Sequence, residues 1–326
     1  METDPQDEQQ EIYILNPFEI LRKGLGVVCF DEKRCQRVGL KKNLSRFRSA
    51  YVGHPRVYAD LFERLQTTEI EEARLDCSIL GREKTLNYFF MTISFLATYP
   101  TEEEAEKSFS FTISERTFRK YVWEITRNIA ALYPSIIFWP DSWGDPNNPN
   151  AGEPHFIITV DGTHCKIEEP TFESFTENKK YYSHKFHSAG LDYEVALSIF
   201  EPRCVWWIAG PYPAGKNDIT IFRHKLKETM LNARESNGVD YRGLADRGYR
   251  GEPELLSVPN SADTEAVREF KGRALSRQET FNARLKCFDC VDERFRHGVE
   301  KHSQCFRACA AIVQLQMDNG FPVFQV

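Results

Sequence analysis

The segment 141–154 (DSWGDPNNPNAGEP) constrains the fold most, because the hydrophobic pattern differs on its two sides. Its density of Pro, Asn, Gly and Asp is typical of a linker. Before it, apolar residues recur at helical spacing. After it, short apolar runs rich in β-branched and aromatic residues predict strands. We expect a disordered tail at 1–12, a helical N-terminal domain at 13–140, a linker at 141–154 and an α/β domain at 155–326. The 326 residues suffice for two domains.

Three helices are predicted in the second half of the N-terminal domain. Residues 83–98 are apolar throughout and predict a buried helix, which Tyr99-Pro100 ends. A short helix begins at Thr101. A third begins at Ser114, a plausible N-cap residue, and carries one apolar stripe. The stripe consists of Phe118, Val122, Ile125, Ile129 and Leu132.

The order of these helices, long, short and then basic amphipathic, is that of a helix-turn-helix unit. Arg116, Arg119 and Lys120 lie off the apolar stripe of the third helix. They are therefore candidate DNA contacts. An ordinary helical bundle with a basic surface is the alternative that this pattern leaves open.

A second basic feature lies closer to the N-terminus. The stretch 33–56 holds eight Lys and Arg residues, Lys41 and Lys42 among them, and no acid. It is interpreted as a patch that binds the phosphate backbone or as a nuclear import signal. A solvated basic face is the alternative. The net charge of −6 argues only mildly against a nucleic-acid partner, because the basic residues cluster.

Composition indicates an intracellular protein without a membrane span. No run of 18 or more apolar residues occurs, and the first residues, METDPQDEQQE, are too acidic and polar for a secretory signal. The nine cysteines are odd in number and scattered, so we expect reduced thiols. Cys287-x-x-Cys290, followed by His297 and His302, suggests zinc. Only six residues separate Cys290 from His297, however, which is short for a zinc finger, so we favour helix packing.

The second half of the chain predicts an RNase H-like fold, a mixed sheet flanked by helices. Three strands come first, then a helix, a strand that ends at Asp246, a short strand and two closing helices. In this fold the first and fourth strands are parallel neighbours at the centre of the sheet. The predicted ranges are strands 156–163, 193–200 and 204–209 with a turn at 201–203, helix 218–231, strands 241–246 and 255–258, and helices 276–295 and 303–317.

Three acids are placed by this order as candidate catalytic residues and metal ligands. Asp161 and Asp246 each end a strand, at the sheet edge where open α/β sheets place their sites, and Glu279 lies in a helix that follows. Mg²⁺ prefers a few carboxylates with water and substrate phosphate, and two such ions can clamp a phosphodiester. The sequence therefore predicts a site for two Mg²⁺ or Mn²⁺ ions.

Other polar residues compete for a role in this site. Asp218 precedes an apolar-periodic run, and we expect it to cap that helix rather than to bind metal. Asp192 and Glu194 flank Tyr193, and we expect them at the surface, with an outer-shell role as the alternative. Lys185 lies in a loop rich in Tyr and Phe between the first two strands, and we favour a contact with DNA phosphate.

The order of short motifs resembles the DDE endonuclease domain of PIF/Harbinger-type transposases and their domesticated relatives. The resemblance covers roughly 155–326. It rests on Val160-Asp161-Gly162-Thr163-His164, Tyr181-Tyr182-Ser183-His184-Lys185-Phe186, Gly190-Leu191-Asp192-Tyr193-Glu194, Gly210-Pro211, Asp218-Ile219, Ala245-Asp246-Arg247-Gly248-Tyr249, Glu279-Thr280-Phe281-Asn282 and Phe295-Arg296-His297.

This resemblance implies a metal-dependent nuclease that cleaves and joins DNA strands in the nucleus. It also implies double-stranded DNA as the substrate and a separately encoded DNA-binding protein as a partner. A homo-oligomer is compatible with the sequence. The alternative function is that of a domesticated, non-catalytic DNA-binding or adaptor protein.

Overall fold

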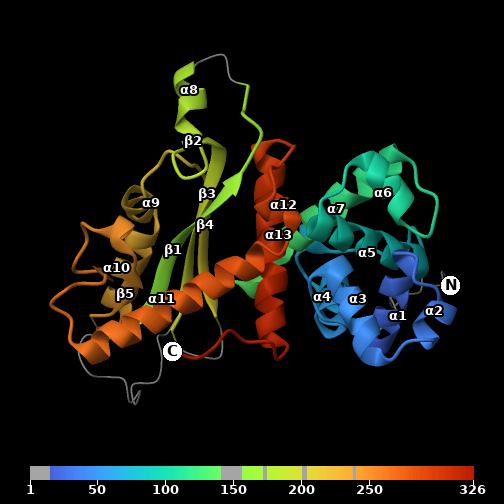
Figure 1. Ribbon diagram of the computed structural model, residues 1–326, viewed down its shortest axis with the longest axis horizontal. Coiled ribbons are helices and arrows are strands. Elements are labelled where there is room, and N and C mark those ends of the chain that lie inside the picture. Colours follow the sequence, from blue (N-terminus) through green and yellow to red (C-terminus); the bar gives the residue numbers. More distant parts are fainter. Residues whose placement is uncertain (1–14, 141–155, 172–174, 200–203, 238–239) are drawn as a thin grey trace, which may run out of the picture.

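The computed structural model describes residues 15–140, 156–171, 175–199, 204–237 and 240–326. The predicted tail at 1–12, linker at 141–154 and turn at 201–203 lie outside the described residues. The described residues form an all-helical N-terminal region and a mixed sheet flanked by helices (Figure 1). The predicted fold class is confirmed, and the strand order is consistent with an RNase H-like fold.

The N-terminal region is helical throughout its described length. Its elements are α1 (Pro17–Val27), α2 (Glu32–Gln36), α3 (Leu40–Tyr51), α4 (Pro55–Thr67), the 3₁₀ turn η1 (Glu71–Ala73), α5 (Arg82–Thr98), α6 (Glu102–Ser108) and α7 (Glu115–Ile136). Thr101 begins α6 with a capping box to Glu104, and Ser114 caps α7 through the backbone N–H of Thr117. No helix in the described parts is both long enough and apolar enough to cross a membrane.

The sheet contains the five predicted strands in the predicted chain order, with β2 as a short additional strand in the segment expected to be a loop. Its strands are β1 (Phe156–Lys166), β2 (Tyr182–Ser183), β3 (Ser188–Ser198), β4 (Val205–Pro213), β5 (Arg242–Ala245) and β6 (Leu256–Ser257). The hydrogen-bonded order is β2-β3-β1-β5-β6, and β4 pairs with β3. β1 pairs antiparallel with β3 and parallel with β5. The first and fourth predicted strands are thus parallel neighbours, as expected.

The helices that accompany the sheet differ from the prediction in their bounds. They are α8 (Phe175–Lys180), α9 (Asp218–His224), α10 (Leu226–Asn237), the 3₁₀ turn η2 (Arg247–Tyr249), α11 (Glu265–Leu285), α12 (Asp289–Asp292) and α13 (Val299–Asp318). The helix predicted at 218–231 breaks at Lys225, whose backbone leaves the helical region. The helix predicted to start at Ser276 begins at Glu265, because the Thr264 side chain caps it there.

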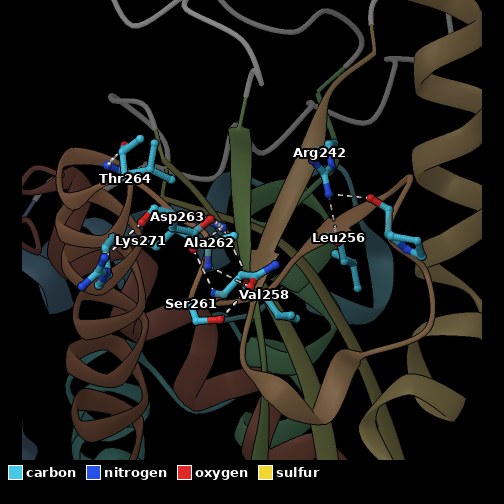
Figure 2. A network of polar contacts seen from close by, with 12 residues as sticks. Arg242, Leu256, Val258, Ser261, Ala262, Asp263, Thr264 and Lys271 are labelled. Carbon is cyan, nitrogen blue, oxygen red and sulfur yellow. Dashed lines mark hydrogen bonds and ion pairs between the residues drawn. The ribbon is translucent and has the colours of Figure 1, made fainter.

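A polar network anchors the start of α11 to the loop after β6 (Figure 2). The buried ammonium of Lys271 donates to both carboxylate oxygens of Asp263 at 2.9 Å and to the carbonyl of Val258 at 3.2 Å. Arg242 of β5 donates to the carbonyl of Leu256 at 3.4 Å. A buried ion pair with its hydrogen bonds satisfied fixes geometry. The network therefore fixes where α11 crosses the sheet, and with it the position of Glu279.

Helix α13 lies between the sheet and the N-terminal helices (Figure 1). It contacts α7 and α4 on one side and β4 and α11 on the other. Nearly every residue from Cys305 to Leu315 is buried, which is typical of a helix enclosed on all sides. One hydrophobic core consequently runs from the N-terminal helices into the sheet region. The division of the chain into two domains stays a prediction.

Candidate functional site

One face of β1 forms a polar ladder with α11. Side chains alternate along a strand, so Thr159, Asp161 and Thr163 share a face. The Thr159 hydroxyl donates to Oε1 of Gln278 at 2.7 Å, and the Thr163 hydroxyl donates to Oδ1 of Asn282 at 2.8 Å. The amide of Asn282 then donates to Oδ2 of Asp161 at 2.8 Å. Asn282 thereby fixes the orientation of the Asp161 carboxylate.

The three predicted acids interact electrostatically at this end of β1. Asp161 is partly buried, while Asp246 and Glu279 are exposed. Burial, followed by the negative charges of Glu279 and Asp246, raises the pKa of Asp161 to about 7. The backbone N–H of Gly162 opposes this rise. A nearby positive charge would therefore stabilise the ionised form of the Asp161 carboxyl.

Asp246 is positioned by the strand that it follows. β5 runs parallel to β1 with Ala245 opposite Val160, so Asp246 and Asp161 leave neighbouring strands at the same edge of the sheet. Oδ1 of Asp246 accepts the backbone N–H of Gly248 at 2.8 Å, which begins the turn η2. The roles of Asp161, Asp246 and Glu279 as ligands stay a prediction.

The opposite face of β1 carries a second polar group, which sequence reasoning missed. Ligand atoms of His164, Asp192 and Asp218 all lie within 4.8 Å of one another, and no other such group of three occurs in the described residues. Asp192 and Glu194 are 0% and 1% exposed, so the prediction that they lie at the surface was wrong. They are buried because β3 is a central strand, paired with β1 and β4.

The expectation for Asp218 was also wrong. Asn217 occupies the cap of α9, and Asp218 is the first residue of the helix. Its carboxylate turns toward the sheet, where a Cβ atom placed on Gly162 would lie 3.1 Å from Oδ1 of Asp218. Burial, and then the charge of Asp246, raises the pKa of Asp218.

Burial also shifts the pKa values of the other groups on this face. It raises the pKa of Asp192 to about 8, with smaller contributions from the charges of Asp218 and Asp161. It raises the pKa of Glu194 to about 8, although the neighbouring Trp207 indole opposes this. Burial, with the charges of Lys185 and Lys286, lowers the pKa of His164 to about 4. His164 is therefore neutral at physiological pH.

Basic and aromatic side chains lie beside this acidic group. Lys185 is exposed, and its charge lowers the pKa values of Asp192 and Asp218. The ring of Phe186 lies 5.4 Å from Nζ of Lys166 and 5.8 Å from Nζ of Lys286. Lys185 thus lies close enough to Asp192 and Asp218 to affect them electrostatically. Its contact with DNA stays a prediction.

The predicted DNA contacts of the N-terminal region lie across α13 from the sheet (Figure 1). Lys41 and Lys42 are exposed on α3, and Arg116, Arg119 and Lys120 are exposed on α7. Arg119 is engaged by Glu102 of α6, with its Nε 2.7 Å from Oε1 of Glu102. The structure brings none of the five into the acidic site.

The residues that suggested zinc are engaged elsewhere. Cys287 is exposed, whereas Cys290 is buried with its Sγ 3.6 Å from Sγ of Cys309. The ring of His297 packs against Trp123, and Nδ1 of His302 lies 2.8 Å from the Tyr193 hydroxyl. Packing accounts for the buried thiol, as favoured from the sequence.

Comparison with known families gives a match over the part of the chain that holds the predicted acids. Residues 160–314 match the family described as DDE superfamily endonuclease. The chain contains a DDE superfamily endonuclease domain. The match begins one residue before Asp161 and extends beyond Glu279, into α13. The chain matches none of the curated proteins and none of the solved structures with which it was compared. The PIF/Harbinger type is a finer assignment than this match provides.

Proposed function

We propose that this protein is a divalent-metal-dependent DNA endonuclease and strand transferase of the transposase type. Asp161, Asp246 and Glu279 would hold two Mg²⁺ or Mn²⁺ ions. The observation that carries the proposal is the parallel pairing of β1 with β5, which brings Asp161 and Asp246 to the same edge of the sheet, inside the matched DDE endonuclease domain that also holds Glu279 of α11. The nucleus as its location and the PIF/Harbinger type belong to the same proposal.

The donor set fits hard divalent cations. All three side chains offer carboxylate oxygen, the ligand that Mg²⁺ and Mn²⁺ prefer. Asp246 and Glu279 are exposed, so ions and substrate can reach them from solvent. A bound cation would relieve the repulsion that raises the pKa of Asp161.

The chain's own groups would prepare this site for cleavage. Asn282 holds Asp161 in one orientation, and the backbone N–H of Gly248 holds Asp246. Lys185 adds positive charge near Asp218, where it could contact a DNA phosphate. When bound, two divalent ions supply the acidity that activates water and the positive charge that stabilises a leaving oxygen.

A second function is supported by the N-terminal region. The exposed basic residues of α3 and α7 lie across α13 from the acids, so they could bind DNA whether or not the acids cleave it. We therefore retain a domesticated, non-catalytic DNA-binding or adaptor protein as the alternative. The double-stranded DNA substrate, the separately encoded partner protein and a homo-oligomer are proposals in either case.

Nicking of supercoiled plasmid tests the proposed function. Wild-type protein should nick in Mg²⁺ and lose this activity with a chelator. Asp161→Asn, Asp246→Asn and Glu279→Gln should each lower the rate on the order of 10³-fold, because several kcal/mol of charge stabilisation are lost.

The matched control is Asp240→Asn. The Asp240 side chain is 96% exposed and lies 3.4 Å from Arg234, away from the acids. This variant should nick like the wild type. Wild-type protein that binds DNA without nicking in Mg²⁺ or Mn²⁺ would favour the non-catalytic alternative.

A further inference from the structure

The second polar group lies on the face of β1 that points away from α11. β1 and β3 pair antiparallel with Gly162 opposite Glu194 and His164 opposite Asp192, so these four residues share a face. Asp161, which precedes Gly162, and Thr163, which follows it, point to the other side. The group is therefore separated from the polar ladder of Asn282 by the thickness of one strand.

Asp218 enters this group from α9, through the space that Gly162 leaves open. A Cβ atom on Gly162 would lie 3.1 Å from Oδ1 of Asp218 and 3.2 Å from Oδ1 of Asp192. Contacts of that length are tighter than most Cβ atoms make. The absence of a side chain at 162 thus lets two carboxylates from different elements approach the same point.

The acids of this group are buried without hydrogen-bond partners. Both carboxylate oxygens of Asp192, both of Glu194, and Nδ1 of His164 have no partner of acceptable geometry. Nδ1 of His164 lies 3.7 Å from Oδ2 of Asp192, which is too far for a hydrogen bond, and the neutral imidazole supplies no positive charge. Buried polar groups are nearly always satisfied, and unpaired buried carboxylates are strongly unfavourable. The charged form of the group is therefore stable only with a ligand that carries positive charge, since protonation is the one other way to neutralise it.

We propose that His164, Asp192 and Asp218 bind a divalent transition-metal ion of the Mn²⁺ and Zn²⁺ class, with Glu194 as a further oxygen donor. Ligand atoms within 4.8 Å of one another are close to the spacing that metal–ligand bonds of about 2.0–2.2 Å require. Imidazole suits Zn²⁺ and related ions, whereas Mg²⁺ and Ca²⁺ take oxygen ligands. The nitrogen donor thus distinguishes this site from the all-oxygen set around Asp161.

The site has a structural role that does not depend on cleavage. It joins α9 to β1 and β3, on the face of β1 opposite to Asp161. Asp218 also links it to the end of β5, because a Cβ atom on Gly248 would collide with Oδ2 of Asp218 and lie 3.0 Å from Oδ1 of Asp246. A bound ion would fix the relative positions of Asp218 and Asp246.

Metal binding to the full-length protein tests this proposal. The background is Asp161→Asn with Glu279→Gln, which removes two of the three proposed catalytic ligands and keeps every residue of the second group. By calorimetry, this background should bind one Mn²⁺ or Zn²⁺ ion, and Mg²⁺ at least about tenfold more weakly. Adding His164→Gln or Asp192→Asn should weaken Mn²⁺ binding about 10–100-fold or more. Adding Asp240→Asn should change nothing.

Pulsed electron paramagnetic resonance supplies a direct signature of the nitrogen ligand. Mn²⁺ bound to the background should show ¹⁴N modulation, and His164→Gln should remove it. Circular dichroism checks that each variant folds. The ¹⁴N signal of the background remains a valid test even if a variant fails to fold. The proposal is overturned if the background retains no ion, if its Mn²⁺ signal lacks ¹⁴N coupling, or if folded His164→Gln and Asp192→Asn variants bind Mn²⁺ unchanged. None of these results bears on whether the wild-type protein nicks DNA in Mg²⁺.

Discussion

The two faces of β1, along residues 161–164, place acids in contrasting surroundings. Toward α11, Asp161 receives the Asn282 amide and faces two exposed carboxylates. Toward α9, Asp192 and Asp218 meet beside His164, and Asp192 is buried without a hydrogen bond. On the first face, Asp161 has a hydrogen-bond partner. On the second face, Asp192 has none, so only an ion or protons can neutralise its charge.

This difference teaches that one strand can serve two sites when small and polar residues alternate along it. Gly162 makes room for carboxylates on one side, while Asp161 and Thr163 engage α11 on the other. A shift of one residue in the register of β1 would exchange the two faces. The network that anchors α11 to the loop after β6 holds this helix over one face of β1 only. It therefore helps to keep the two sites on separate faces.

The largest expected effect concerns the pH dependence of stability without metal. The folded state raises the pKa of Asp192 and Glu194 to about 8 and of Asp161 to about 7. The folded protein therefore binds more protons than the unfolded chain between roughly pH 4 and 8. The free energy of unfolding, measured with urea in a chelator, should fall by a few kcal/mol as pH rises through this window.

The variants divide this effect between the two faces. Asp192→Asn with Glu194→Gln should flatten the pH profile more than Asp161→Asn does. A profile that rises between pH 5 and 8, or one that only Asp161→Asn flattens, would contradict the contrast between the faces.

Gly162→Ala should have the next largest effect, by destabilising the group on the second face. The added Cβ would press against Asp218 and Asp192, so we expect a loss of about 1–3 kcal/mol of stability. The control is Gly272→Ala in α11, where no atom lies within 4 Å of the added Cβ. That change should stabilise the helix by about 0.5–1 kcal/mol. Thermal unfolding of both variants decides, and equal stability would remove the steric argument.

Asn282→Ala tests how the first face orients Asp161. It removes the hydrogen bond that orients Asp161, so we expect about tenfold slower Mg²⁺-dependent nicking. Gln278→Ala is the matched control, one turn earlier on α11, because Gln278 accepts from the neutral Thr159 and touches no acid of the set. It should lower stability with little change in rate. Equal slowing by both variants would assign the effect to helix packing instead.

The smallest effect is expected in the N-terminal helices. Lys41→Ala with Lys42→Ala on α3 should lower the log–log salt slope of DNA affinity by about 0.9 for each lost phosphate contact. Arg116→Ala with Lys120→Ala tests α7 in the same way. Arg119 is left intact because it is held by Glu102. Unchanged slopes in both variants would identify these residues as ordinary solvated surface.

The sequence predicted the chain order of five strands because apolar runs and their ends are local signals, and the parallel pair β1–β5 followed from the RNase H-like fold that this order indicates. It also placed Ser114 and Thr101 as helix starts, since capping depends on a few neighbouring residues. It could not place Asp192, because burial of an acid depends on which strands cover it, and that is set by pairing between distant segments.

The polar partners of β1 on α11 were missed for a related reason. Gln278 and Asn282 are four residues apart, so they share one helix face, and Asn282 lies three residues after the predicted acid Glu279. That spacing was a usable signal. The role of His164 had none, because only the register of β1 against β3 brings it to Asp192.

The central claim is that Asp161 binds metal during cleavage, and exchange of its ligand atom tests this most directly. Nicking by Asp161→Cys should be lost in Mg²⁺ and recovered in Mn²⁺, because Mn²⁺ accepts a thiolate better than Mg²⁺ does. Asp161→Ala should stay inactive in both. The account is contradicted if Asp161→Cys nicks in Mg²⁺ at the wild-type rate, or if Mn²⁺ restores Asp161→Ala as well as Asp161→Cys.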